Sequence, residues 1–293
     1  MRNKVLVFGS CNLDMVFSVP HIALPGETIG AAGVALHCGG KGLNQAVALA
    51  RAGIPTAFAG SIGADGASLR GMLNENGVDT AYLLDSGVPT GRAIIQVADN
   101  GENSIVLYPG ANQDITRQQI DAALSEFSAG DVIVLQNEIS EIIYLIERAS
   151  SLGLRIVLNP SPFNAVFRTV DLSRLALLIV NETEAAGFTG SADTDAFLQW
   201  AAQNCPSLPC VLTLGAAGSV YTCDGYTVRQ PAIKADVVDT TCAGDTFTGY
   251  FLAARLRGQD VPAALEIAAR AAALTISQPG AAESIPLAEQ LAK

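Results

Sequence analysis

The chain alternates short apolar runs rich in β-branched residues with longer segments in which apolar side chains recur at the helical period. The short runs predict buried strands at residues 5–8, 57–62, 132–135, 156–158, 177–180 and 211–214. The longer segments predict helices at residues 42–52, 118–127, 142–151, 195–204 and 261–276. Strands that alternate with helices form mainly parallel sheets with helices on both faces, so we predict an α/β fold of that kind.

Two segments, 15–36 and 89–108, break this alternation. Both show strand-like alternation with Gly and Pro punctuation, and the turn signal Asp99-Asn100-Gly101 separates the runs 93–98 and 104–108. Neither segment has the pattern of a crossover helix, so we predict a small separate β-sheet that projects from the main domain. Because no repeat or Pro-rich linker is visible, residues 1–293 are predicted to form one domain.

Composition narrows the class of protein. Charged residues are only 15% and apolar residues 49% of the 293 positions, which is typical of a globular chain. The formal net charge of -11 argues against broad electrostatic binding to nucleic acid or to an anionic membrane. The first residues lack a signal peptide pattern and no apolar run approaches about 20 residues, so a cytoplasmic protein is expected.

The cysteines give no sign of a metal site. No CxxC pair occurs among them, and the two histidines do not complete a zinc pattern. We therefore interpret all six as small buried hydrophobic residues: Cys11, Cys38, Cys205, Cys210, Cys223 and Cys242.

The segment Asp239-Thr240-Thr241-Cys242-Ala243-Gly244-Asp245-Thr246-Phe247 predicts an anion-binding turn. Ala243 and Gly244 open a helix, and their small side chains leave its first N–H groups accessible to a phosphate, which the helix dipole also favours. Asp245 places a carboxylate beside this phosphate site, where a base is needed if a hydroxyl is to attack phosphorus. The segment therefore indicates phosphoryl transfer.

Polar residues follow the first predicted strand. Asn12 and Asp14 point to one side if the chain is extended there, so an amide and a carboxylate could hold neighbouring hydroxyl groups. A turn or a helix cap is the alternative interpretation. Glu138 follows the strand at 132–135 on the same sheet edge, and a helix-opening acid is its alternative.

A glycine-rich block, Gly39-Gly40-Lys41-Gly42, would let the backbone approach a small molecule, with Asn44 at the start of the next helix. A flexible turn is the alternative. The block does not fit GxxxxGK[ST], so Lys41 is not predicted to be a P-loop lysine.

Two further blocks follow predicted strands. Asn181-Glu182-Thr183-Glu184 supplies carboxylate and amide oxygens that could order Mg²⁺ and its water ligands. Its glycosylation sequon has no meaning without secretion. Thr213-Leu214-Gly215-Ala216-Ala217-Gly218 is a weak signal for a nucleotide loop.

Taken together, the blocks at 39–46, 181–184 and 239–247 resemble those of the ribokinase branch of the carbohydrate kinases that share the phosphofructokinase B fold. The resemblance covers nearly the whole chain. It implies a ribokinase-like three-layer α/β/α fold with a small β-sheet lid formed by residues 15–36 and 89–108, and a homodimer through that lid.

The resemblance also implies roles for individual residues. The sugar ligands would be Asn12, Asp14, Gly40, Lys41, Asn44, Glu138 and Asp245. The catalytic group would be Asp245 with Gly244 and Ala243. The nucleotide ligands would be Asn181, Thr213, Gly215, Gly218 and Gly244. Glu184 would hold Mg²⁺ through water, and K⁺ would be held as an activator by Asp239, Thr241, Gln278, Gly280 and Ser284, whose alternative is a purely structural turn.

The activity implied is transfer of the ATP γ-phosphoryl group to a primary hydroxyl, with D-ribose as the expected acceptor and D-ribose 5-phosphate as product. A kinase of the same fold for 2-deoxyribose, a ketohexose or a nucleoside is one alternative. A sugar or nucleotide sensor without turnover is another, but the intact Asp245 and Gly244 disfavour it. A dehydrogenase is disfavoured because Gly9-Ser10-Cys11 does not begin a GxGxxG loop.

Overall fold

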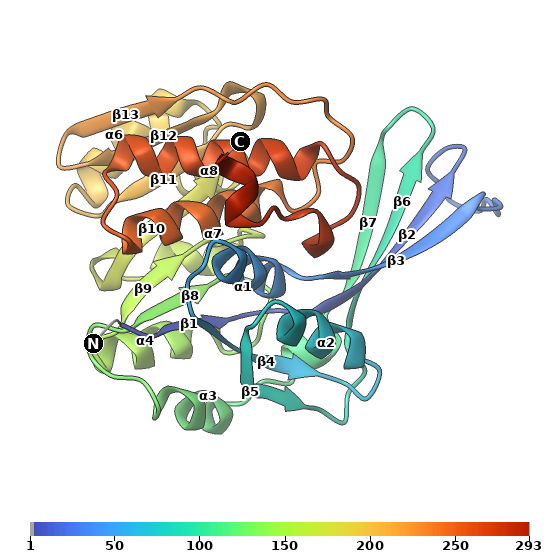
Figure 1. Ribbon diagram of the computed structural model, residues 1–293, viewed down its shortest axis with the longest axis horizontal. Helices are drawn as coiled ribbons and strands as arrows, with labels where there is room; N and C mark the ends of the chain where they lie inside the picture. The colour runs from blue at the N-terminus through green and yellow to red at the C-terminus, as the bar shows by residue number, and fades with distance from the viewer. Residues whose placement is uncertain (1–2, 293) are drawn as a thin grey trace.

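A nine-stranded sheet and a separate four-stranded sheet form the framework of the protein (Figure 1), whose computed structural model describes residues 3–292. The larger sheet has the strand order β13-β12-β11-β10-β9-β8-β1-β4-β5, and the smaller has the order β3-β2-β6-β7. Their bounds are β1 Val5–Phe8, β2 Asn12–Val19, β3 Gly33–Gly39, β4 Thr56–Ile62, β5 Asp79–Asp85, β6 Gly91–Ala98, β7 Asn103–Tyr108, β8 Val132–Leu135, β9 Arg155–Leu158, β10 Leu175–Asn181, β11 Cys210–Thr213, β12 Ser219–Cys223 and β13 Tyr226–Gln230.

The larger sheet is parallel from β11 to β5, and β12 and β13 add an antiparallel hairpin at one edge. The six predicted strands are confirmed to within two residues at each end. Strand β5 and the edge hairpin were not predicted.

Within residues 3–292, eight α-helices connect and cover the strands of the larger sheet. Their bounds are α1 Lys41–Arg51, α2 Ala67–Glu75, α3 Arg117–Leu124, α4 Ile142–Ser151, α5 Glu182–Thr189, α6 Thr194–Asn204, α7 Ala243–Leu256 and α8 Val261–Ile276. The five predicted helices are present, although α3 ends three residues earlier than expected, and α7 begins at Ala243 as expected. Helices α2 and α5 were not predicted. No described helix is long and apolar enough to cross a bilayer.

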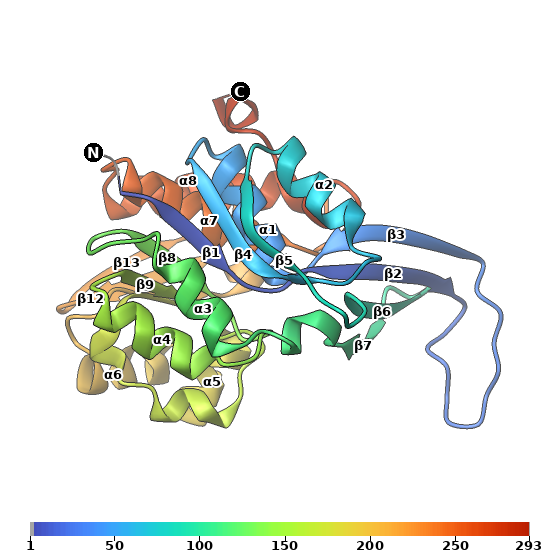
Figure 2. The same ribbon diagram turned by 90° about the horizontal axis from the view of Figure 1, so that it is seen from below.

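Alternate residues of each central strand pack on opposite faces of the sheet, as the side-chain period of two requires. Val5 and Val7 of β1 join a buried cluster with α1, α2, α7 and α8, whereas Leu6 and Phe8 join a second cluster with α3, α4, α5 and α6. Figure 2 shows these two groups of helices on either side of the sheet. The predicted three-layer α/β/α arrangement is therefore confirmed.

The four-stranded sheet projects from the main domain (Figure 1). Two of its strands extend beyond the predicted segment 15–36, because β2 begins at Asn12 and β3 ends at Gly39. The predicted turn lies between β6 and β7, where Gly101 adopts a φ of 85°. We refer to β2, β3, β6 and β7 as the lid.

The cysteines only partly follow the expectation. Four of them, Cys11, Cys205, Cys210 and Cys242, are buried. Cys38 of the lid and Cys223 of the edge hairpin are only half-buried, because both lie on peripheral strands, so the expectation was wrong for these two.

Helices α1 and α7 cross closely at Gly249. A Cβ atom at this position would lie 2.4 Å from the Cβ of Ala48 and 3.0 Å from the backbone nitrogen of Leu49, both on α1. Gly71, in the middle of α2, has open space where its Cβ would be.

We therefore expect opposite effects from the same substitution at these two glycines. Gly249→Ala should lower the midpoint of urea unfolding, since the two helices must separate and overpacking costs about 1–3 kcal/mol. Gly71→Ala should leave the midpoint unchanged or raise it, because Ala is the better helix former by about 0.5–1 kcal/mol. An equal midpoint shift in the two variants would show that the close crossing is not required.

Candidate active site

The predicted site residues gather at one edge of the larger sheet. Strands β11, β10, β9, β8 and β1 are neighbours, and each ends in a polar residue or is followed by one at its carboxyl end. Open α/β sheets bind their ligands at this edge. The topology therefore places a candidate site above the middle of the sheet.

Asp245 lies in the first turn of α7 with only 8% of its surface exposed. Its two carboxylate oxygens accept hydrogen bonds from two side chains of α1: Asn44 Nδ2 at 3.0 Å and Gln45 Nε2 at 2.9 Å. Because both oxygens have an amide donor, the carboxylate is fixed in orientation toward α1.

Gln45 links Asp245 to two strands of the sheet. Its amide nitrogen also donates to Asn159 Oδ1 at 3.1 Å, and its amide oxygen accepts from Gln136 Nε2 at 2.7 Å. All of these side chains are buried. The sequence interpretation missed all three residues. The available signal was a polar residue directly after the strands 132–135 and 156–158.

Asn12 and Asp14 lie on β2 at the base of the lid, and both are buried. They belong to a strand, so the turn or cap interpretation was wrong. Asn12 Oδ1 accepts a hydrogen bond from Asn112 Nδ2 at 2.8 Å, and the same amide binds the backbone of Cys11. Asn112, which follows β7, was also missed.

Two buried oxygens in this region have no hydrogen-bond partner among the described residues: Asp14 Oδ1 and Asn44 Oδ1. A buried polar atom without a partner costs about 1–3 kcal/mol, so such atoms mark a position where a ligand can bind. A polyol could satisfy both oxygens through its hydroxyl groups.

The pKa of Asp14 is raised to about 7. Burial is the main cause, and the nearby carboxylates of Glu138, Glu283 and Asp245 add to it. The folded protein therefore holds Asp14 partly protonated near neutral pH, when its carboxyl can donate as well as accept a hydrogen bond.

The glycine block is packed too closely to be only a flexible turn. Gly40 has a φ of 96°, and a Cβ there would lie 2.8 Å from the carbonyl oxygen of Ser10. A Cβ at Gly42 would lie 2.5 Å from the backbone nitrogen of Ser10. The flexible-turn interpretation was therefore wrong: the glycines bring the start of α1 against the residues that follow β1.

Glu138 accepts hydrogen bonds from the hydroxyl of Ser10 and from the backbone N–H of Lys41. Helix α4 begins only at Ile142, so the alternative of a helix-opening acid was wrong. Burial opposes the charge of Lys41, but the carboxylates of Asp245, Glu138 and Glu184 outweigh it, and the pKa of this lysine is raised. Lys41 is therefore a cation at neutral pH.

A cavity of about 240 Å³ lies on the other side of Asp245. Among the residues that line it are Lys41, Asn181, Glu184, Thr213, Gly244 and Asp245. A Cβ at Gly244 would meet no atom within 4 Å, so the first turn of α7 faces open space. The positive end of a helix dipole thus points at a cavity that also contains a lysine, which suits an anion.

Cys242 precedes this turn in the left-handed conformation, with a φ of 66°. Burial, together with the nearby Asp245, raises the pKa of its thiol well above the usual value. The thiol therefore stays protonated, which agrees with its interpretation as a packed residue rather than a reactive one.

Asn181 and Glu184 form a reciprocal capping box at the start of α5. Asn181 Oδ1 accepts from the Glu184 N–H at 2.9 Å, and Glu184 Oε2 accepts from the Asn181 N–H at 2.8 Å. Glu184 is nevertheless placed at the wall of the cavity, and no lysine, arginine or histidine lies within salt-bridge distance of it among the described residues. Its negative charge is thus available to an ion or to ordered water.

The predicted nucleotide loop is only partly at the cavity. Thr213, at the end of β11, lines it, whereas Gly215 and Gly218 lie further along the chain in the turn that leads to β12. Gly218 has a φ of 98°, and a Cβ there would lie 2.0 Å from the carbonyl oxygen of Gln230. The edge hairpin therefore requires a glycine at position 218.

Asp239 joins the two loops of the predicted monovalent-cation site. One carboxylate oxygen accepts from the Thr241 N–H at 2.9 Å, and the other accepts from the Gly280 N–H at 3.2 Å. Gln278 and Ser284 line a different cavity, beside Arg51, and Ser284 donates to the carbonyl of Ala281. The structure thus brings together three of the five predicted residues through direct contacts.

Comparison with known proteins agrees with this geometry. Residues 2–288 match the family described as pfkB family carbohydrate kinase. A ribokinase of Haemophilus influenzae is 34% identical over 99% of this chain and 97% of its own, and a deoxyribokinase of Salmonella typhi is 32% identical over 98% and 96%. The structure of Arabidopsis thaliana ribokinase complexed with ribose and ATP superposes with a TM-score of 0.87 at 29% identity, covering 100% of this chain and 98% of that one.

The raised pKa of Asp14 predicts how stability changes with pH. Near pH 4 and below, the carboxyl is protonated in both the folded and the unfolded chain. As the pH rises from about 4 to about 7, the unfolded chain loses the proton first, so folding becomes less favourable; above about pH 7 both states are ionised and the effect is constant.

Asp14→Asn removes this titration. Its free energy of unfolding relative to the wild type should therefore increase from pH 4 to pH 7 by up to about 4 kcal/mol and then level off. Urea unfolding at a series of pH values would measure this, with Asp99→Asn in the exposed lid turn as the control. A difference independent of pH would contradict the prediction.

Proposed function

Because the chain belongs to the pfkB family of carbohydrate kinases, we propose that it transfers the γ-phosphoryl group of ATP to the O5 hydroxyl of D-ribose, giving ADP and D-ribose 5-phosphate. The observation that carries the proposal is the position of Asp245, which lies between the polar residues at the base of the lid and the cavity at the start of α7. The full-length similarity to ribokinases supports ribose as the acceptor.

The sugar would bind at the base of the lid. Asn12 and Asp14 present an amide and a carboxyl from one face of β2, and Asn44 Oδ1 is the unpartnered acceptor on α1. Lys41, Gly40 and Glu138 complete the set. A hydroxyl that satisfies a buried polar atom contributes strongly to selectivity, since an acceptor that lacks it leaves the atom unpaired.

In the proposed reaction Asp245 accepts the proton of the attacking hydroxyl. The O5–H bond breaks as O5 bonds to the γ-phosphorus, and the bond from the γ-phosphorus to the bridging oxygen of ADP breaks. Because the transition state of phosphoryl transfer is loose, the main tasks are positioning and stabilisation of charge. The N–H groups at Ala243 and Gly244 and the ammonium of Lys41 would stabilise the negative charge of the transferring group.

The nucleotide would occupy the cavity bounded by Asn181, Thr213 and Gly244, with Gly215 and Gly218 shaping the loop beyond it. Glu184 is suited to hold Mg²⁺ through water, because it lies at the cavity wall and forms no salt bridge among residues 3–292. Bound Mg²⁺ would supply neutralisation of the phosphate charge.

Asp239, Thr241 and Gly280 form the part of the proposed K⁺ site that is connected in the structure, and the oxygens of a carboxylate and of nearby carbonyls suit a hard cation. Gln278 and Ser284 would complete it. The ion would add positive charge beside the anion-binding turn.

A second candidate acceptor is 2-deoxyribose. It is favoured because the chain is 32% identical to a deoxyribokinase, close to the 34% identity with the ribokinase. The two sugars differ only in the 2-hydroxyl. Direct comparison of turnover with each sugar therefore decides between them.

We expect ADP release from ATP and Mg²⁺ to be fastest with D-ribose, compared with 2-deoxyribose, fructose and nucleosides, and to increase on addition of K⁺. Asp245→Asn should lower turnover by about 10²–10⁴-fold, the usual contribution of a general base, while calorimetry detects sugar binding that is largely intact, because the other sugar ligands remain. Asp99→Asn is the matched control and should keep full turnover.

Faster turnover with 2-deoxyribose than with D-ribose would identify 2-deoxyribose as the acceptor and would leave the proposed mechanism unchanged. Near wild-type turnover of Asp245→Asn would exclude Asp245 as the base. Sugar binding without turnover of any acceptor would favour a sensor.

We further propose that the chain acts as one catalytic domain and forms a homodimer through the lid. Cross-strand register places Leu36, Met15, Ile94 and Val106 in one row across the four strands, and Ala35, Val16, Ile95 and Ile105 in the next row, which faces the opposite side. Leu36, Ile105 and Val106 are 72%, 58% and 59% exposed. A thin sheet with apolar rows on both faces suits burial against a second copy.

The double variant Ile105→Asp/Val106→Asp places one charge on each face of the lid. The wild type should sediment at twice the chain mass of 30.3 kDa, and the variant at the monomer mass, because burying unpaired charges is strongly unfavourable. Val166→Asp, at an exposed apolar position outside the lid, is the control. A monomeric wild type, or a dimeric double variant, would contradict the proposal.

A further inference from the structure

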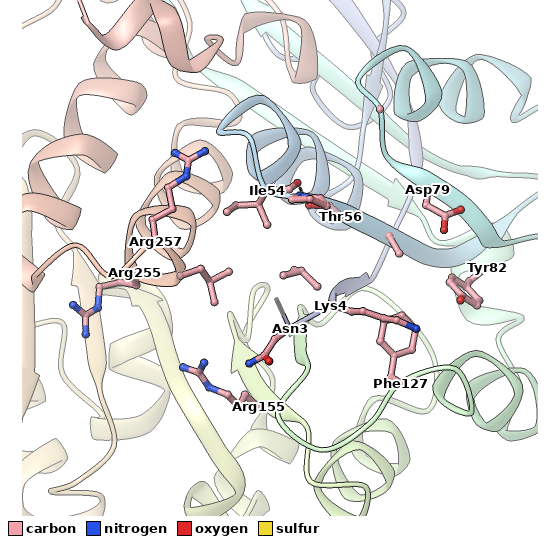
Figure 3. A pocket seen from close by; sticks show the side chains of 15 residues that line it. Asn3, Lys4, Ile54, Thr56, Asp79, Tyr82, Phe127, Arg155, Arg255 and Arg257 are labelled. Atoms are coloured by element: carbon pink, nitrogen blue, oxygen red, sulfur yellow. Dashed lines mark hydrogen bonds between the residues drawn. The ribbon is translucent and has the colours of Figure 1, made fainter. Parts of the chain in front are cut away.

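A second and larger cavity lies at the opposite edge of the main sheet from Asp245. It has a volume of about 830 Å³ and is bordered by the amino ends of β1, β4 and β9 and by the carboxyl end of α7. Figure 3 shows its lining side chains. The activity proposed above uses none of these residues.

Four basic side chains line this cavity: Lys4, Arg155, Arg255 and Arg257. None of them has a carboxylate within 4.0 Å among residues 3–292, whereas seven of the twelve described arginines do have one. In a chain with a net charge of -11, this is a local concentration of uncompensated positive charge. Such a concentration attracts anions.

Three of these side chains are held by neutral groups. Arg257 donates to the carbonyl of Ala52, Arg255 to that of Gln259, and Lys4 to that of Glu126. A carbonyl orients a cation without cancelling its charge, and each guanidinium keeps further N–H donors. The cations are thus positioned but not neutralised.

The helix dipole explains the positions of only two of these four basic residues. Arg255 and Arg257 lie at the carboxyl end of α7, where the helix dipole favours cations. Arg155 is the first residue of β9 and has no such reason, and no hydrogen bond of its side chain is present within the described chain. Arg155 also borders a smaller adjoining cavity together with Arg255.

The other side of the cavity is aromatic. The rings of Tyr82 and Phe127 lie with their centroids 5.6 Å apart. In Figure 3 these rings lie across the cavity from the three arginines, on the same side as Asp79, whose carboxylate accepts the N–H of Ala81. The cavity therefore has three arginines on one side and two aromatic rings on the other, where the ammonium of Lys4 lies 5.5 Å from the centroid of the Phe127 ring. An organic group can pack against this second side.

We propose that this cavity binds a small phosphorylated organic molecule, with its phosphate toward Arg155 and Arg255 and its organic part against Tyr82 and Phe127. Guanidinium groups bind phosphate through paired N–H donors, and they do so better than a single ammonium. A volume of about 830 Å³ is that of a metabolite-sized site and is larger than inorganic phosphate needs.

Isothermal titration with phenyl phosphate tests the proposal, with saturating ADP and Mg²⁺ present so that the nucleotide site is filled. We expect saturable binding to the wild type, and weakening by about tenfold or more in Arg155→Ala, since the variant loses the charge-assisted hydrogen bonds from the guanidinium to the phosphate. Arg155 is exposed and its side chain makes no hydrogen bond among residues 3–292, so the variant should fold normally. Arg168→Ala, another arginine without a carboxylate partner, is the matched control and should bind as the wild type does.

Inorganic phosphate tests the contribution of the anionic group alone, and benzyl alcohol tests that of the aromatic group alone. Each should bind more weakly than phenyl phosphate. Absence of saturable binding would overturn the proposal, as would equal affinity in Arg155→Ala. Inorganic phosphate binding as tightly as phenyl phosphate would overturn the role of the aromatic side.

Discussion

The hydrogen bonds from Asn44 and Gln45 to Asp245 are the contacts on which the rest of the candidate site depends. They join α1 to α7, and so connect the segment that follows the lid to the segment that faces the nucleotide cavity. Side-chain amides can span this gap only because the helices cross without a side chain at Gly249 and because Gly42 lets α1 approach the end of β1. Close backbone packing thus sets the position of the proposed base.

The same region contains buried polar atoms that the protein alone does not satisfy. Among residues 3–292, Asp14 Oδ1 at the base of the lid and Asn44 Oδ1 on α1 have no hydrogen-bond partner, and nearby carboxylates help to raise the pKa of Asp14. A fold that keeps such groups gives up some stability, and a ligand with hydroxyl groups can recover it on binding. Recognition of a polyol would then follow from features that are unfavourable in the free protein.

The sequence was sufficient for what depends on local pattern. Long periodic segments such as α8 and buried runs such as β1 were correctly placed. The turn before Asp245 indicated phosphoryl transfer, and the glycine-rich block indicated a loop that can approach a small molecule. Short elements were missed: α2 and α5 have only nine and eight residues, and the edge hairpin around Asp224-Gly225 was overlooked although its turn residues were visible.

The polar residues behind the site could not be found in this way. Gln45 contacts Gln136 and Asn159, which are 91 and 114 positions away in the chain, and Asn112 reaches Asn12 across 100 positions. A polar residue after a strand looks like an ordinary loop residue until the fold brings its partner beside it. Similarly, only the structure shows that Asp239 contacts both Thr241 and Gly280, which is 41 positions away.

The lid meets the main domain at the residues that would hold the sugar. Asn12 begins β2, Gly39 ends β3 and Gly91 begins β6, and these three are paired side by side. The lid therefore joins the main domain at the proposed sugar site, and each of its two central strands, β2 and β6, extends over eight residues, about 26 Å. A rotation of the lid about this base would displace the tip much more than the proposed sugar ligands, so opening of the lid would leave those residues nearly in place.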